Sequence, residues 1–273
     1  MIHYLRLARI GNVIIAFISV EVAGILCGIN VAHSWPIFAG AIGASLVTAG
    51  GNAINDFFDV EVDRINRPDR PLPSGRLPAE HAKYFYIACT FVGLVVSAAV
   101  NLPAFLIAAA AAVLVFMYSY RLKRMIFVGN LAVALVTGAA FIYGGAAVRD
   151  FHDVYPAAVF AFLANLIREI IKDAEDVKGD SEAGIRTIAT RYGARVSAWI
   201  SIVLTAVLLF AAWGAFEIGI LPIQFLTVCG LTVFPIGVYV TYLLISRSGF
   251  SEASFGYKLI MIFGLVALIV GKV

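Results

Sequence analysis

The sequence has little charge and few of the residues that a water-soluble surface needs. Only 14% of its 273 residues are Asp, Glu, Lys or Arg, and 62% are apolar. Soluble globular domains carry about 25% charged residues, and the mean hydropathy here is +0.94. A soluble protein of this composition would expose too many apolar side chains to water, which argues against that class. The composition indicates no nucleic-acid partner, and no protein partner is inferred from it.

Cysteine and histidine are also scarce. The three cysteines, Cys27, Cys89 and Cys229, stand in separate apolar runs, and the four histidines are scattered along the chain. Neither residue type shows the spacing of a disulfide framework or of a zinc site. We therefore expect packing or interface roles for them.

What the chain has in abundance is apolar runs of membrane length. A helix needs about 20 residues to cross the hydrocarbon core, and nine candidate segments come close to that length. Their approximate bounds are 11–30, 36–57, 84–101, 103–119, 127–147, 155–171, 196–216, 222–245 and 255–271. Four of them have a proline at their start, where the missing N–H costs little. The sequence thus predicts an all-α integral membrane bundle of nine transmembrane helices, forming a single domain over residues 1–273.

Basic residues are confined almost entirely to alternate connections between these segments. Eighteen of the 20 lie in the N-terminal stretch or after segments two, four, six and eight; only Arg149 and Lys272 do not. Because Lys and Arg concentrate in cytoplasmic loops, we expect the N-terminus inside and the C-terminus outside. The two longest connections are then both inside, and function is expected on the cytoplasmic face of the cell membrane. The first segment carries Glu21 and lacks a small-residue cleavage site, so it is expected to be retained.

The first long connection opens with an acidic stretch, NAINDFFDVEVD, which begins at Asn52. In a helix of about 100° per residue, five polar side chains fall within one arc of about 100°. They are Asn52, Asn55, Asp56, Asp59 and Asp63. Glu61 points away from this stripe. Since Pro68 disfavours helix at the residue before it, the helix should end near Asn66.

The second long connection opens with a similar stretch, NLIREIIKDAEDVKGD, which begins at Asn165. In a helix, four acidic residues three or four positions apart share one stripe. They are Glu169, Asp173, Asp176 and Asp180. Segment six lies four segments after segment two, so both stripes reach the same membrane face. A weak internal duplication of a four-helix unit would give this arrangement.

Two carboxylate stripes on one face repel each other unless a cation lies between them. Carboxylate and amide oxygens are hard ligands that suit Mg²⁺, so we predict a magnesium site. Its candidate ligands are Asn55, Asp59, Asp63, Asp173, Asp176 and Asp180. Mg²⁺ is usually held by a few carboxylates together with substrate phosphate.

Basic side chains near the stripes would complete a polyphosphate site. The candidates are Arg67, Arg70, Lys123, Arg168, Lys172 and Lys178. At the inside ends of other segments, Arg9, Asn12, Asn52 and Tyr118 are further candidates for substrate contact. The alternative for each basic residue is a topology or headgroup charge, and for the tyrosine an interfacial anchor.

These residues resemble the motifs of the UbiA superfamily of intramembrane prenyltransferases. Asn55-Asp56, Asp59 and Asp63 match its NDxxDxxxD motif, and Asp173, Asp176 and Asp180 match its second Asp-rich motif. The RPLPSG run follows the first motif as it does in that family, which is also a nine-helix bundle. The segments GNLAVALVTGAAFIYGGAAV and REIIKDAEDVKGD most resemble the archaeal branch that makes digeranylgeranylglyceryl phosphate.

The resemblance implies a Mg²⁺-dependent prenyltransferase of lipid synthesis that ionises a prenyl diphosphate, geranylgeranyl diphosphate in that branch. The implied catalytic residues are Asn55, Asp56, Asp59, Asp63, Asp173, Asp176 and Asp180. The free hydroxyl of geranylgeranylglyceryl phosphate would attack the allylic cation, and Arg9, Lys123 and Arg168 are candidates to hold the phosphate of this acceptor. The general base stays open between an Asp of the stripes and the released pyrophosphate.

Three other functions compete with this one. A UbiA-type enzyme with an aromatic or quinone-precursor acceptor would carry the same motifs. A phosphatidyltransferase would need a DGxxAR pattern, and the chain has no Asp-Gly dipeptide. A cation-coupled transporter would place its ionisable residues near the midplane, where Glu21 stands nearly alone.

Overall fold

Every element of the part of the chain that the structure describes is a helix. The computed structural model describes residues 2–151, 153–246 and 249–272, apart from the side chain of residue 33. In chain order the elements are α1 (Ile2–Ala8), α2 (Ile10–Leu26), η1 (Val31–His33), α3 (Trp35–Phe58), α4 (Val60–Asn66), α5 (Ala79–Val100), α6 (Leu102–Tyr120), η2 (Leu122–Arg124), α7 (Val128–Val148), α8 (Val154–Glu175), α9 (Val177–Glu182), α10 (Ile188–Tyr192), α11 (Ala194–Glu217), α12 (Ile223–Val228), η3 (Cys229–Val233), α13 (Phe234–Ser246) and α14 (Phe250–Lys272).

Eight of the described spans are long and apolar enough to cross a membrane, with α12, η3 and α13 together forming one of them. The pair α1 and α2 makes a ninth if its two bent parts count as one span. Their axes differ by 56° at Arg9, whose backbone is left-handed (φ 51°). The predicted all-α membrane bundle is confirmed. Which face of the membrane each end occupies stays a prediction.

The short break between α5 and α6 shows how a single polar residue can separate two spans. Asn101 accepts a hydrogen bond from the backbone N–H of Ala104 at 2.8 Å and so caps α6. Its amide donates to the carbonyls of Ala146 and Ala147 at the end of α7, at 2.9 and 3.1 Å. The same residue therefore ends one helix, begins the next and ties both to a third.

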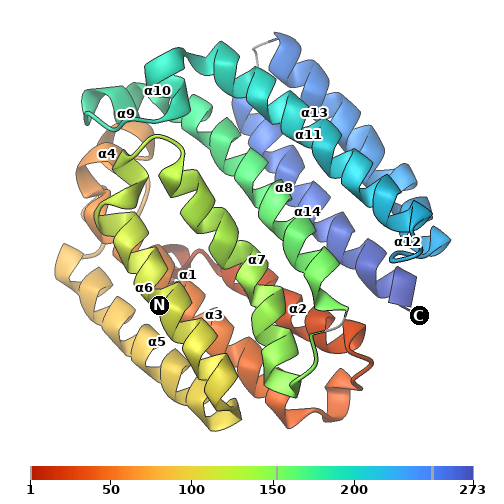
Figure 1. Ribbon diagram of the computed structural model, residues 1–273. Helices are drawn as coiled ribbons and strands as arrows, with labels where there is room; N and C mark the ends of the chain where they lie inside the picture. Colours follow the sequence, from red (N-terminus) through yellow and green to blue (C-terminus); the bar gives the residue numbers. More distant parts are fainter. Residues whose placement is uncertain (1, 152, 247–248, 273) are drawn as a thin grey trace.

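The long helices form a ring around a central space. α2 packs against α3 and α7, α7 against α8, α8 against α14, and α14 returns to α2. α5 and α6 cover the outside on the α3 side, and α11 to α13 cover it on the α8 and α14 side (Figure 1). Small residues let helices approach closely: a Cβ on Gly93 of α5 would lie 2.9 Å from the Gly43 carbonyl of α3.

The two ends of the bundle differ in chemistry. The short helices α4, α9 and α10 gather at one end, which we call the α4–α9 end (Figure 1). At the opposite end Lys272, near the C-terminus of α14, lies 2.6 Å from Asp153, just before α8. Both acidic stretches of the sequence lie at the α4–α9 end.

Candidate functional site

The first acidic stretch lies at the junction of α3 and α4. The prediction of one continuous helix is wrong at Asp59: its backbone (φ −99°, ψ 4°) ends α3 and begins α4. α4 does end at Asn66, as predicted from the following proline. Glu61 also lies as predicted, exposed on the outer side of α4 and 2.7 Å from Arg64.

The second acidic stretch has the same construction. α8 ends at Glu175, and Asp176, with φ −90° and ψ 5°, joins it to α9. The prediction of an uninterrupted helical stripe therefore fails here too. Each stretch is a long membrane helix, an aspartate at a bend, and a short helix that carries the last aspartate of its motif.

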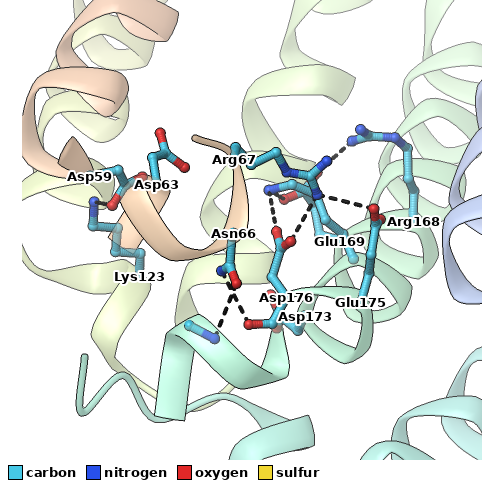
Figure 2. A network of polar contacts seen from close by, with 12 residues as sticks. Asp59, Asp63, Asn66, Arg67, Lys123, Arg168, Glu169, Asp173, Glu175 and Asp176 are labelled. Atoms are coloured by element: carbon cyan, nitrogen blue, oxygen red, sulfur yellow. Dashed lines mark hydrogen bonds and ion pairs between the residues drawn. The ribbon is translucent and has the colours of Figure 1, made fainter. Parts of the chain in front are cut away.

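The two short helices are held together by one side chain. The Asn66 amide of α4 donates to the Asp176 carbonyl at 3.2 Å, and its oxygen accepts the Gly179 N–H of α9 at 3.1 Å (Figure 2). The contact is too close for any Cβ on Gly179, which would lie 2.4 Å from the Asn66 oxygen. The clamp from Asn66 to Gly179 fixes the spacing of the two motifs.

Cations from other elements neutralise the carboxylates of the first motif. Arg9, between α1 and α2, contacts Asp56. Arg70 lies 2.5 Å from Asp63 and 3.3 Å from Asp56. Lys123, beyond the end of α6, contacts Asp59. Burial raises the pKa of Asp63, and Arg70 opposes that change. Removing Arg70 or Lys123 would leave Asp63 or Asp59 without its cation.

The second motif, in the second half of the chain, is paired with side chains that come from the first half. Arg67 reaches Asp176 at 2.8 Å and Glu175 at 3.2 Å (Figure 2). The Asn130 amide of α7 donates to Asp173 at 2.8 Å. Arg67 follows α4 directly, so it links the first acidic stretch to the second by charge, next to the Asn66 clamp.

Two further observations test whether these residues suit a divalent cation. The Asn55 oxygen is buried and has no hydrogen-bond partner, although a buried amide oxygen normally has one. Burial raises the pKa of Asp180 to about 7, with Asp176 and Asp59 adding to the rise against Lys172 and Lys123. Both features fit a hard cation. The unpaired Asn55 oxygen could coordinate such an ion, and the charge of the ion would offset the repulsion between the carboxylates.

Among the described residues, no three Asp, Glu, His or Cys side chains lie close enough together to hold a metal by themselves. Mg²⁺ takes only one or two carboxylates at many phosphate-transfer sites and completes its shell with substrate phosphate and water. The residues therefore fit a cation that binds together with a phosphorylated ligand better than one held in a protein-only cage.

Two connected cavities lie beside the acidic stretches. The outer one, which we call the basin, has a volume of about 980 Å³ and is bordered by α1, the connection after α4, α8 and the start of α14. The inner cavity, of about 210 Å³, lies within the helix ring. The same five side chains line both, so they form a neck between them: Arg9, Asn12, Arg168, Lys172 and Lys258.

The inner cavity changes from polar to apolar with depth. Its residues Ile15, Ser19, Thr137 and Met261 also line a third space that is bordered almost wholly by apolar side chains. That space runs between α7, α8, α11 and α14 and includes Phe141. A ligand with a charged head and a long hydrocarbon tail matches this gradient.

The candidate residues from the sequence fall into four places. Arg9, Asn12, Asn52, Asn55, Tyr118, Arg168 and Lys172 line the inner cavity. Asp56, Arg67 and Arg70 line the basin, which Arg9, Asn12, Arg168 and Lys172 also border. Asp59, Asp63, Lys123, Asp173, Asp176 and Asp180 line neither cavity and belong to the acidic cluster beside them. Lys178 is exposed on α9 and lines neither cavity.

Sequence reasoning missed three residues that the structure brings to the site: Asn130 and Asn66 hold the motifs, and Lys258 lines both cavities. Glu169, which the sequence placed in the second stripe, is buried between Arg168 and Lys172. Asn130 gave a signal, since it is an amide near the start of an apolar segment. The roles of Asn66 and Lys258 depend on partners more than 80 positions away, which no local pattern reveals.

Known proteins are similar to this chain in sequence and fold. The chain matches the UbiA prenyltransferase family over residues 16–265. It is 40% identical to the digeranylgeranylglyceryl phosphate synthase of Methanopyrus kandleri over 75% of each chain. A solved structure of a digeranylgeranylglyceryl phosphate synthase superposes with a TM-score of 0.75 and 30% identity, over 99% of this chain and 97% of that one.

A more distant structure shares the fold. A UbiA homologue from Archaeoglobus fulgidus, solved with bound GPP and Mg²⁺, has a TM-score of 0.73 at 21% identity and covers 97% of this chain and 99% of its own. The fold is therefore shared with a protein of low sequence similarity.

Proposed function

The chain belongs to the UbiA prenyltransferase family, and on that premise we propose that it transfers a geranylgeranyl group from its diphosphate to the free hydroxyl of geranylgeranylglyceryl phosphate. The product is digeranylgeranylglyceryl phosphate, an ether lipid. The observation that carries the proposal is the convergence of two aspartate-rich bends beside a cationic neck that opens into an apolar cavity.

The leaving diphosphate is proposed to sit against the acidic cluster. Asp59, Asp63, Asp173, Asp176 and Asp180, with Asn55, would hold Mg²⁺, which neutralises the charge that develops on the departing diphosphate. Of the nearby bases, Lys123, Arg67 and Arg70 already contact these carboxylates. On substrate binding they are proposed to donate to phosphate oxygens in the same place.

The inner cavity is proposed to protect the allylic cation. When the bond between C1 and the diphosphate oxygen breaks, the electron pair leaves with the diphosphate, and water must be kept from C1. Tyr118 of α6 and the aliphatic side chains of Ile15 and Val136 line this cavity. The prenyl tail is proposed to extend from there into the apolar space beyond Ser19 and Thr137.

The acceptor completes the reaction when its hydroxyl oxygen forms a bond to C1 and gives its proton to an Asp of the stripes or to the released pyrophosphate. Its hydrocarbon chain is proposed to enter from the bilayer, which suits a multi-pass integral membrane protein. We place the site at the cytoplasmic face, because the sequence has most of its basic residues on that side under the positive-inside rule.

A reconstituted assay tests the proposal. Purified protein in lipid nanodiscs would be given geranylgeranyl diphosphate, Mg²⁺ and geranylgeranylglyceryl phosphate, and the lipid product followed by mass spectrometry together with pyrophosphate release. We expect digeranylgeranylglyceryl phosphate and one pyrophosphate per product. In a parallel reaction 4-hydroxybenzoate replaces the glycerol phosphate, and turnover of that acid alone would overturn the proposed acceptor.

A further inference from the structure

A lysine of the last helix stands where the two cavities meet. Lys258 lies on α14, is half-buried, and lines both the basin and the inner cavity. Ser251 and Ser254 stand about two turns and one turn before it on the same helix and line the basin. α14 packs against α2 and α8, the helices that carry the other residues of the neck. Lys258 thus faces a ligand that passes from the basin inward.

Lys258 differs from its cationic neighbours in having no acidic partner. Arg9 contacts Asp56, and Arg168 lies 2.6 Å from Glu169. Lys172 lies 3.9 Å from Glu169 and 4.0 Å from Asp176. Within the described part of the chain, no hydrogen bond or ion pair joins Lys258 to any side chain. A partly desolvated, unpaired ammonium is costly, and an anionic ligand would offset that cost.

The electrostatic surroundings strengthen this contrast. The other charged side chains that line both cavities, Arg9, Arg168 and Lys172, are all positive. The carboxylates of Asp59, Asp63, Asp173 and Asp180 line neither cavity that Lys258 borders. Other carboxylates do border these cavities, among them Glu169 the inner one and Asp56 and Glu175 the basin, but each of these three is paired with an arginine. Among the described residues, Lys258 is therefore the neck cation that no carboxylate balances.

We infer that Lys258, together with Arg168 and Arg9, forms a subsite for the phosphate monoester of the acceptor lipid, separate from the place of the leaving diphosphate. The inference rests on the proposed function. Lys258 would contribute the charge that no protein carboxylate balances, and the two guanidinium groups would each give planar donors to phosphate oxygens. Ser254 offers a hydroxyl to the same group.

The chemistry of glycerol explains why the phosphate belongs at the neck. The free hydroxyl and the phosphate of the acceptor sit on the same three-carbon unit, only a few bonds apart. A phosphate fixed at the neck would place that hydroxyl at the mouth of the inner cavity, where the prenyl C1 is proposed to lie. Lys258 would then make this chain select a phosphorylated acceptor over a neutral one.

Direct binding without metal is the first test. Isothermal titration in EDTA would compare geranylgeranylglyceryl phosphate with geranylgeranylglycerol, which lacks the phosphate, on wild type and on Lys258→Met. We expect wild type to prefer the phosphorylated lipid, and Lys258→Met to weaken its binding about 10- to 100-fold, the effect of one charge-assisted hydrogen bond. Equal binding of both lipids to wild type, or unchanged binding to the variant, overturns the inference.

Two control variants distinguish loss of phosphate recognition from loss of folding and from loss of charge. Lys272→Met removes a lysine from the opposite end of the same helix, where it pairs with Asp153, and is expected to bind the acceptor as wild type does. Lys258→Arg keeps the charge and should retain most of the preference for the phosphorylated lipid. Thermal melting of each variant shows whether it is folded, and loss of the preference in Lys258→Arg as complete as in Lys258→Met would count against a charge-based role.

Kinetics separate this inference from the proposed function. In Lys258→Met we expect KM for the acceptor to rise about 10- to 100-fold while KM for geranylgeranyl diphosphate changes less than about three-fold. A rise confined to the diphosphate substrate would assign Lys258 to the leaving group and overturn the inference. If wild type binds the acceptor but forms no product, the proposed function fails and the subsite stands. If wild type forms product but binds the phosphorylated and the neutral lipid equally, the subsite fails and the proposed function stands.

Discussion

Three carboxylates of the site are balanced by cations from outside the two acidic helices that carry them. Asp59 is held by Lys123, Asp63 by Arg70 and Asp176 by Arg67. These partners allow carboxylates to crowd at the end of a membrane helix, where an unpaired charge would be expensive. They also mean that a substituted aspartate leaves a cation behind.

Replacement of Asp59 or Asp176 by alanine is expected to abolish transfer, with at least about a 100-fold loss of kcat, because the variant loses a proposed metal ligand at the leaving group. Pyrophosphate release by purified protein measures it. The matched control is Glu61→Gln, two positions after Asp59 but exposed and, among the residues that the structure describes, paired only with Arg64. Its activity should stay within about two-fold of wild type, as a surface substitution does. Wild-type turnover in either aspartate variant would remove the metal-site hypothesis.

Asn130 supports Asp173, a proposed metal ligand, without being a proposed ligand itself. Its amide donates to Asp173 at 2.8 Å, and no other side-chain donor to Asp173 is found within the described residues. Asn130→Ala should therefore raise the Mg²⁺ concentration needed for half-maximal activity by about 10- to 100-fold, as loss of a ligand's supporting hydrogen bond does elsewhere. A Mg²⁺ titration of initial rates measures this shift. Reduced activity at saturating Mg²⁺ with an unchanged midpoint would assign Asn130 a different role.

At the scale of elements, the two acidic stretches are built alike. In each, an aspartate bend turns a membrane helix into a short helix, and the short helices α4 and α9 meet at Asn66 and Gly179. Gly179→Ala would bring a Cβ to 2.4 Å from the Asn66 oxygen, so α4 and α9 must separate. We expect a lower melting temperature and loss of most activity, because overpacking of this kind costs about 1–3 kcal/mol.

A double variant distinguishes crowding from lost hydrogen bonds. Combining Gly179→Ala with Asn66→Ala removes the clash but also both hydrogen bonds, so the melting temperature should recover while activity stays low. Gly214→Ala is the control, since no atom lies within 4 Å of a Cβ there. Its melting temperature should be unchanged or slightly raised, as expected for alanine in a helix. Full activity in Gly179→Ala would show that the spacing of the motifs is unimportant.

The elements show where sequence reasoning succeeds and where it stops. Hydropathy and the placement of basic residues predicted all nine spans, because length and charge are local properties. The bends at Asp59 and Asp176 were not predicted, since the residues around each are compatible with a continuous helix. Placing the residues at about 100° each around a helix nevertheless identified the aspartates. A break at a single residue changes the direction of the side chains beyond it but keeps them at the same end of the bundle.

At the scale of the whole molecule, the site depends on helices that are far apart in sequence. The acidic cluster uses α3, α4, α8 and α9, while the neck also needs α2 and α14. The two Asp-rich motifs therefore predict the residues proposed to bind the diphosphate well. They do not predict the residues proposed to bind the acceptor. Lys258, near the start of the last span, is the clearest example.

Metal dependence belongs to this scale because the proposed ligands come from both halves of the chain. Activity should be lost in excess EDTA and restored when Mg²⁺ is returned in excess over the chelator. Ligand-free protein in EDTA should keep its helical circular dichroism spectrum, since the helices are stabilised by the ion pairs and packing described above. Undiminished activity in EDTA would exclude Mg²⁺, and loss of helicity would mean that the metal is structural.

The orientation of the bundle is the last property of the whole molecule that the sequence predicts and the fold leaves open. Cysteine can be placed at exposed Glu182, in α9, or at exposed Ile220, between α11 and α12 at the opposite end, after Cys27, Cys89 and Cys229 are replaced. A membrane-impermeant maleimide should label position 220 in intact cells and position 182 only after permeabilisation, because the α4–α9 end carries the inside connections under the positive-inside rule. Activity of both labelled proteins shows that each is folded. The reverse pattern would place the acidic cluster outside, where a cytoplasmic prenyl diphosphate could not reach it.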